Sequence, residues 1–168
     1  MKYKQIKDRE MHRIVSTAII HKDGKFLITK RSMNKKVFPG KWTVPGGGMA
    51  IDDYIDEKSN ADGCWYFPME KSLRREITEE VGLKVGKIDY LLDLCFIRPD
   101  NVPVITLSFY APHKSGNVIL SEEDTEFAWI KRKDVKKYDL ITGIGEEIYM
   151  VDDILKGKKP KNYFKDIK

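Results

Sequence analysis

The chain has few of the residues that stabilise small secreted or metal-binding folds. It contains two cysteines, Cys64 and Cys95, and their separation does not match the short spacings of a zinc site. Two cysteines cannot build a disulfide framework, so we interpret both as reduced thiols of a cytoplasmic protein. No apolar run approaches about eighteen residues, and the opening stretch MKYKQIKDRE is charged. A membrane span and a secretory signal peptide are therefore not expected.

Basic residues are concentrated at one end of the chain. The formal net charge is +5, and residues 156–168 hold six lysines and one aspartate, which accounts for that excess. Residues 1–155 therefore balance near zero, and we expect no nucleic-acid partner. A 168-residue chain with 41% hydrophobic and 34% charged residues fits one globular domain. We predict a single domain over residues 1–155 and a Lys-rich, solvated tail over residues 156–168.

Residues 73–83 (LRREITEEVGL) have the periodicity of an amphipathic helix. At roughly 100° per residue, three glutamates share one face beside an apolar stripe: Glu76, Glu79 and Glu80. Pro68 suits the first turn of this helix, and Gly82 suits its end. Three clustered carboxylates repel one another unless a cation lies among them, and Mg²⁺ or Mn²⁺ prefers oxygen ligands. The alternative is a solvated charged face balanced by nearby basic residues.

A glycine-rich turn lies upstream, at residues 42–48 (WTVPGGG), where glycines let the backbone approach a phosphate or a metal closely. Together with residues 75–83 (REITEEVGL), it resembles the Nudix (MutT-like) box. The family pattern is Gly, five residues, Glu, seven residues, then Arg-Glu-apolar-any-Glu-Glu-any-Gly-apolar. The second half matches at every specified position, and the resemblance covers residues 12–155.

The first half of the box departs from the family pattern. Counting back from Arg75, the leading glutamate falls on Phe67, and Gly47 lies twenty positions before Phe67 instead of six. Fourteen extra residues thus separate the glycine turn from the helix. Six nearby acids are candidates to replace the missing carboxylate: Asp52, Asp53, Asp56, Glu57, Asp62 and Glu70. The inserted segment, residues 50–67, ends in CWYF; we consider a substrate lid, a surface excursion and a homodimer contact as its role.

The rest of the chain alternates strand-like with helical stretches. We predict strands at 12–20, 26–30, 102–111 and 126–130, a bent strand or strand pair over 85–97, and helices starting near 133 and spanning 144–155. Asp23-Gly24 predicts a hairpin turn. This order indicates an α+β class, as an α/β/α sandwich. It agrees with the fold that the resemblance implies, a mixed β-sheet between helices.

The resemblance implies Mg²⁺-dependent hydrolysis of a diphosphate linkage in a nucleoside diphosphate derivative, with Mn²⁺ as a second suitable ion. Our first expectation is a nucleoside triphosphate pyrophosphohydrolase that releases nucleoside monophosphate. A nucleotide-sugar or ADP-ribose pyrophosphatase comes next. Two other classes stay open: isopentenyl diphosphate isomerisation on the same scaffold, and a non-hydrolytic nucleotide-binding regulator. The isomerase would need a cysteine and a glutamate flanking an allylic carbon, and neither cysteine is clearly placed for that.

The resemblance also assigns roles to single residues. Four groups are expected to hold the metal: Glu76, Glu79, Glu80 and the Gly46 carbonyl. The catalytic set contains Glu79, Glu80, Arg75 and Glu123, with Glu122 as an alternative to Glu123. Arg75 is expected to orient Glu79 through an i, i+4 pair. Substrate contacts are expected from Arg31, Trp42, Gly47 and Gly48, although the Trp42 ring could instead pack under the loop. Four aromatic residues are candidates to stack a base: Phe38, Trp65, Tyr66 and Tyr110.

Overall fold

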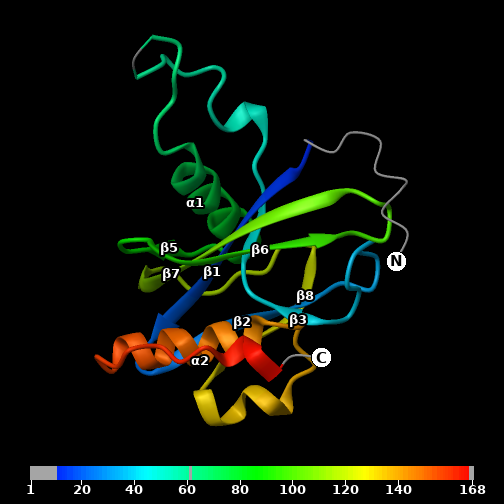
Figure 1. The fold of residues 1–168 in the computed structure, drawn as a ribbon, viewed down its shortest axis with the longest axis vertical. Coiled ribbons are helices and arrows are strands. Elements are labelled where there is room, and N and C mark those ends of the chain that lie inside the picture. Colours follow the sequence, from blue (N-terminus) through cyan, green and yellow to red (C-terminus); the bar gives the residue numbers. More distant parts are fainter. Residues whose placement is uncertain (1–10, 61, 167–168) are drawn as a thin grey trace.

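The computed structural model describes residues 11–60 and 62–166, which form one mixed sheet with a helix against each face (Figure 1). Within these ranges there are eight strands: β1 (Arg13–Lys22), β2 (Lys25–Arg31), β3 (Trp42–Thr43), β4 (Gly46–Gly48), β5 (Lys84–Val85), β6 (Asp89–Ile97), β7 (Pro103–Ser115) and β8 (Asp124–Ile130). The α-helices are α1 (Pro68–Val81) and α2 (Ile144–Leu155). The short 3-10 helices are η2 (Ile51–Asp53), η3 (Arg132–Lys137) and η4 (Tyr163–Asp166). The α+β prediction is confirmed.

Strand β1 is the centre of the sheet. It pairs in parallel with β7 along one edge and antiparallel with β2 and β4 along the other. Both of its faces are buried, because Ala18 and Ile20 contact the core under α1 whereas Ile19 contacts the core under α2. A strand covered on both faces carries consecutive apolar residues, which explains the fully buried run Ala18-Ile19-Ile20.

The hairpin between β1 and β2 forms where the sequence predicts it. Asp23 and Gly24 have φ angles of 50° and 69°, so both occupy the left-handed region. Two positive φ angles in a two-residue loop define the type I′ turn, whose twist matches that of the flanking strands.

Helix α1 begins at Pro68 and ends before Gly82, as predicted. Gly82 has φ 68°, and its N–H donates to the Thr78 carbonyl oxygen at 3.0 Å. The apolar stripe is fully buried against β1, β2 and β7: Leu73, Ile77 and Val81. Burial of this stripe leaves the glutamate face of the helix toward the glycine strand β4.

Two sequence predictions resolve differently in the structure. Residues 85–97 form a strand pair, β5 and β6, and both pair antiparallel with β7. The helix expected from about residue 133 is the 3-10 helix η3, in which Val135 is buried among charged neighbours. A stretch with so narrow an apolar face has too little packing to extend into an α-helix. Helix α2 has the predicted bounds, Ile144–Leu155.

The inserted segment projects away from the sheet and returns at the start of α1 (Figure 1). Its own contacts hold it together: the Tyr54 and Trp65 rings lie 5.4 Å apart, and the Trp65 indole N–H donates to the Glu57 carbonyl oxygen at 2.9 Å. Tyr66 and Phe67 are 61% and 80% exposed. The segment therefore forms an excursion with exposed aromatic residues at its end.

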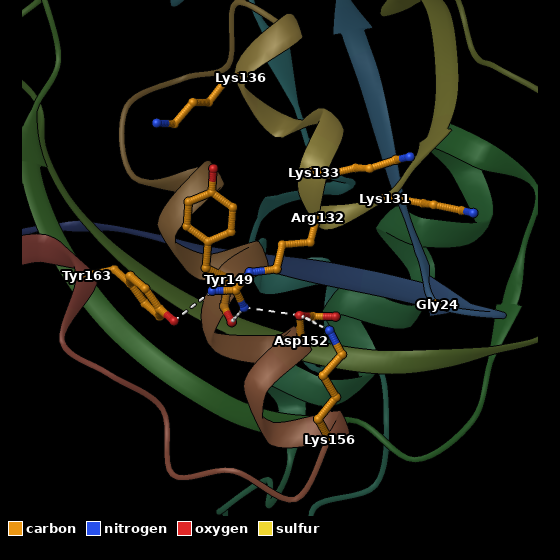
Figure 2. Close-up of a pocket in the computed structure, with 9 residues that line it drawn as sticks. All are labelled: Gly24, Lys131, Arg132, Lys133, Lys136, Tyr149, Asp152, Lys156 and Tyr163. Carbon is orange, nitrogen blue, oxygen red and sulfur yellow. Dashed lines mark hydrogen bonds and ion pairs between the residues drawn. The ribbon is translucent and has the colours of Figure 1, made fainter.

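The Lys-rich tail is anchored through a tyrosine. The Arg132 guanidinium lies 4.8 Å from the Tyr149 ring and 5.4 Å from the Tyr163 ring, and Figure 2 shows it beside both rings. The Tyr163 hydroxyl donates to Asp153 Oδ2 at 2.6 Å and accepts from Arg132 at 2.8 Å. The tail was expected to be solvated; its lysines within the described residues are exposed, but Tyr163 packs on α2. Nowhere in the described ranges is a helix long and apolar enough to cross a membrane.

Candidate active site

A cavity of about 660 Å³ opens beside the glycine strand β4. Its walls include β1, β4, the glutamate face of α1, the loop after β2, parts of β6 and β7, and the starts of β8 and α2. The cavity thus joins the two halves of the sequence motif, since the glycines and two of the three glutamates line it: Gly46, Gly47, Gly48, Glu76 and Glu80. The two halves are separated by more residues than the resembling family pattern has, yet both line one cavity.

Glu80 is the carboxylate most strongly affected by its surroundings. The Gly46 backbone N–H donates to Glu80 Oε2 at 2.8 Å. Burial raises the pKa of Glu80 to about 8; the Gly46 hydrogen bond opposes this rise, and the negative charges of Asp124 and Glu76 add to it. A carboxyl in this state gains most from a cation, because a positive charge nearby would stabilise the ionised form.

Glu76 lies against the backbone of Gly47. A Cβ at Gly47 would be 2.3 Å from the Glu76 carboxyl carbon, so a side chain there would displace the carboxylate. Arg75 donates to Glu76 Oε1 at 2.8 Å. Burial nevertheless raises the pKa of Glu76, with Arg75 opposing the rise. The glycine at position 47 therefore lets the Glu76 carboxylate lie directly against the backbone of β4.

Asp53 is the candidate acid that contacts Arg75 of the helix motif. Its side chain is 3% exposed and accepts from Arg75 Nε at 2.6 Å and from the Ala50 N–H at 2.9 Å. The Arg75 hydrogen bond holds the pKa of Asp53 at about 2. Asp53 lies six positions after Gly47, the same distance that separates the glycine from the leading glutamate in the family pattern. The extra residues thus follow Asp53 rather than precede it, and counting forward from Gly47 would have singled out Asp53 among the six candidate acids.

The three helix glutamates do not converge on one point. Glu79 is 58% exposed and accepts from Arg75 Nη1 at 2.8 Å, which confirms the predicted i, i+4 contact. Arg75 also pairs with Glu76, and so draws two of the three carboxylates to itself. Within residues 11–60 and 62–166, no three His, Cys, Asp or Glu side chains lie close enough to hold a metal ion. In this arrangement the three carboxylates do not meet and Glu79 does not line the cavity, so their shared role as metal ligands stays a prediction.

The acidic run before β8 contributes two carboxylates to the cavity. Glu123 lines it and pairs with Lys35, whereas Glu122 does not line it. Asp124, which our sequence reasoning did not single out, is 9% exposed and also lines the cavity. Burial raises the pKa of Asp124, while Arg31 and Lys35 oppose the rise. No local pattern distinguishes Asp124 from its two acidic neighbours; its burial depends on the pairing of β8 with β2.

The predicted substrate contacts divide into two groups. Arg31 lines the cavity and donates through Nε to the Val37 carbonyl oxygen at 3.0 Å. Gly48 also lines it, with the Arg13 guanidinium where a Cβ would otherwise lie. Trp42 does not line the cavity; its ring packs edge-on against Tyr138, with centroids 5.0 Å apart. Packing under the loop is therefore the role the structure gives Trp42.

The cavity holds one of the four expected aromatic residues, Phe38, and one that was not expected, Phe96. Phe38 and Phe96 line it, with ring centroids 5.9 Å apart. Trp65, Tyr66 and Tyr110 do not line it. No described residue of the inserted segment from 50 to 67 contributes to the cavity wall, so nothing in this arrangement supports a lid.

The cavity shown in Figure 2 has a different character. It is lined by Tyr149, Tyr163, Asp152 and several cations, without any glycine strand or glutamate cluster. Arg132 there is paired with Asp152 and Asp153. Lys131 and Lys133 extend toward Gly24, while Lys136 extends the opposite way (Figure 2). These cations do not converge on one ligand position, and we assign this region to anchoring of the tail.

Comparison with known proteins finds relatives whose sequences match most of this chain. No family model matches the sequence. The chain is 30% identical over 140 residues to the nucleoside triphosphatase NudI of Klebsiella pneumoniae subsp. pneumoniae, covering 77% of this chain and 89% of that protein. NudI of Escherichia coli strain K12 is 30% identical over 138 residues, covering 76% and 88%.

Solved structures share the fold. The MutT protein of Methanosarcina mazei Go1 has a TM-score of 0.66 at 23% identity, covering 90% of this chain and 99% of that one. The Nudix domain of Shewanella oneidensis NrtR, solved in complex with ADP ribose, has a TM-score of 0.65 at 20% identity, covering 91% and 96%. The sheet and its two flanking helices are therefore shared with these proteins.

Proposed function

Because the chain belongs to the Nudix hydrolase family and is a pyrophosphohydrolase, we propose that its substrate is a nucleoside triphosphate, cleaved to nucleoside monophosphate and pyrophosphate. The relatives at 30% identity are nucleoside triphosphatases, and the sequence match covers 89% and 88% of their lengths. This supports a nucleoside triphosphate as the substrate class. The observation that carries the proposal is the cavity in which the Gly46–Gly48 backbone meets Glu76 and Glu80.

A divalent ion fits the residues at this end of the cavity. Two carboxylates with raised pKa values, Glu76 and Glu80, face glycine backbone that leaves no room for a side chain at Gly47. Oxygen donors of this kind suit Mg²⁺, and Mn²⁺ as a second ion. We propose Glu76, Glu80 and the Gly46 carbonyl as ligands, joined by Glu79 once it leaves Arg75. A bound ion would neutralise phosphate charge and lower the pKa of its water.

The protein's own residues have separate tasks in this scheme. Cations at the cavity wall would hold the phosphate oxygens: Arg13, Arg31, Lys35, Lys36 and Arg98. Glu80 or Glu79 would accept the proton of the attacking water, with Glu123 as a further acceptor. Arg75, fixed by Asp53, would hold Glu76 and Glu79 in position. Positioning of the diphosphate and charge neutralisation are the main requirements of such a transfer.

A second candidate substrate is ADP-ribose or a nucleotide sugar. The related Nudix domain of NrtR was solved with ADP ribose, and its fold matches 91% of this chain. A regulator that binds such a ligand without cleaving it would use the same cavity. Product release distinguishes this regulator from the enzyme.

A panel of nucleotides tests the proposal. The protein would be incubated with nucleoside triphosphates, ADP-ribose and nucleotide sugars in Mg²⁺, in Mn²⁺ and in chelator, and the products separated by chromatography. We expect nucleoside monophosphate and pyrophosphate from a triphosphate in the presence of either ion. Preferential cleavage of ADP-ribose would replace the first substrate class with the second. Binding without any product would establish the regulator instead.

A further inference from the structure

Glu147 is a buried carboxyl in the cavity wall that the proposed hydrolysis does not use. It lies on α2, is 3% exposed and lines the same cavity as Glu76 and Glu80. The Ser108 hydroxyl on β7 donates to its Oε2 at 2.5 Å. No described residue forms an ion pair with it, and Oε1 has no hydrogen-bond donor among the described residues. A buried carboxyl with a single hydrogen bond is costly to ionise, and a ligand that donates to Oε1 would lower that cost.

The sheet register places this carboxyl at a defined distance from the glycine strand. Gly46 on β4 lies opposite Thr17 on β1, and Thr17 lies opposite Ser108 on β7. Two strand spacings therefore separate the Gly46 and Ser108 backbones, roughly 10 Å. A nucleotide whose phosphates lie at β4 would extend its base across β1 toward Ser108 and Glu147.

The surroundings of Glu147 suit a nucleobase rather than another phosphate. Leu94, Phe96 and Ile144 provide apolar wall for the faces of a ring. A carboxyl oxygen accepts hydrogen bonds from N–H groups, which bases carry on their edges, but it repels phosphate oxygens. The cationic side chains of the cavity would therefore hold the phosphates, and Glu147 would lie beside the base.

We propose that Glu147 is a specificity-determining residue that accepts an N–H of the substrate's nucleobase at Oε1, with Ser108 as its positioning residue. The proposal rests on the proposed function, since it presumes that a nucleotide occupies this cavity. Burial raises the pKa of Glu147 to about 7, with the Ser108 hydrogen bond opposing and Glu146 adding to the rise. A base N–H donated to the ionised carboxyl would offset part of that burial cost.

The test compares kcat/KM for triphosphates of the four bases in wild type, Glu147→Gln and the matched control Glu146→Gln. In Glu147→Gln the Ser108 hydroxyl can still donate to the amide oxygen. The amide NH₂ group then faces the base and cannot accept its N–H. We expect the preferred nucleotide to lose about tenfold or more relative to the least preferred one. The control should keep the wild-type ranking.

Ser108 provides a second test that does not alter the carboxyl. Ser108→Ala should narrow the range of kcat/KM values among the four triphosphates. Ser108→Thr keeps the hydroxyl and should therefore keep the wild-type range. Thermal unfolding of each variant checks the fold. An unchanged ranking in both Glu147→Gln and Ser108→Ala would overturn the proposal.

Binding separates this proposal from the proposed hydrolysis. Calorimetric titration with non-hydrolysable triphosphates measures base preference without turnover. Base-dependent binding that Glu147→Gln abolishes, in a protein that cleaves no nucleotide, would support the role of Glu147 and refute the hydrolysis. Cleavage with an unaltered ranking in the variants would support the hydrolysis and refute the role of Glu147. A wild type that neither binds nor cleaves any of the four would refute both.

Discussion

Arg75 and Asp53 form an ion pair at 2.6 Å although 22 positions separate them. The pair connects the end of the glycine turn to the helix that carries the three glutamates. Asp53 is buried and Arg75 makes its other bonds to Glu76 and Glu79, so one guanidinium orders both ends of the interrupted motif. The inserted residues leave from this pair without disturbing it.

Removal of the Asp53 carboxylate should damage both activity and stability. In Asp53→Ala, Arg75 loses its buried partner and no longer holds Glu76, so we expect kcat/KM to fall by about 10–100-fold. Urea unfolding should show a loss of about 1–3 kcal/mol at neutral pH. The exposed neighbour variant Asp52→Ala is the control. Equal effects at the two positions would contradict the role of Asp53.

The same variant carries a pH signature. Because the pKa of Asp53 is lowered to about 2, its stabilisation is full above the unfolded value of about 3.9 and disappears as the pH falls through 2. The difference in unfolding free energy between wild type and Asp53→Ala should therefore shrink between pH 5 and pH 2. A constant difference over this window would argue that Asp53 is stabilised by packing alone.

Deletion of residues 54–67 should leave the chemistry intact. The deletion brings Asp53 to eight positions before Arg75, the spacing of the family motif, and removes no residue that lines the cavity. We expect a folded protein whose ranking of nucleotide substrates matches wild type, measured over the same substrate panel. A changed ranking in a folded deletion variant would revive the interpretation of this segment as a lid.

Stability should depend on pH through Glu147. Its pKa is raised to about 7 by burial, so the folded protein binds a proton that the unfolded chain releases near pH 4.3. The stabilisation of the folded state by this bound proton is full below pH 4.3 and is lost as the pH rises through 7. Glu147→Gln should therefore gain stability relative to wild type over that range, on the order of 1–3 kcal/mol. Denaturant unfolding at several pH values measures it, with Glu146→Gln as the variant expected to show no such trend.

The tail anchor should matter for stability and not for catalysis. Tyr163→Phe removes the hydroxyl that bonds both Arg132 and Asp153, and hydrogen bonds to charged groups contribute about 1.5–3 kcal/mol. We expect a lower melting temperature with kcat/KM unchanged. Tyr66→Phe, at an exposed position, is the control. A loss of activity in Tyr163→Phe would instead connect the tail to the active site.

Local signals in the sequence were sufficient for the elements and insufficient for the packing between them. Pro68, Gly82 and the apolar stripe of α1 act within one helix, and the Asp23-Gly24 turn is set by two residues, so both were predicted. Glu147 differs, because its burial depends on Ser108, 39 positions away. Nothing near Glu147 in the sequence distinguishes it from its neighbour Glu146.

The divergence of the three glutamates has the same origin. The helix periodicity correctly placed them on one side of α1, but side-chain direction depends on which partners compete for each carboxylate. Arg75 takes Glu79 and Glu76, and the Gly46 N–H takes Glu80. The motif predicts the acids; the contacts between β4, η2 and α1 decide where their oxygens lie.

The central claim is that Glu80, held by the Gly46 N–H beside the cavity, works with a divalent ion to cleave a nucleotide diphosphate linkage. The most direct measurement is kcat for nucleoside triphosphate hydrolysis at saturating Mg²⁺ in wild type, Glu80→Gln and the exposed control from the same helix, Glu70→Gln. We expect kcat to fall about 100-fold or more in Glu80→Gln, with the fold retained and the control unaffected. Near-native turnover in folded Glu80→Gln would contradict it.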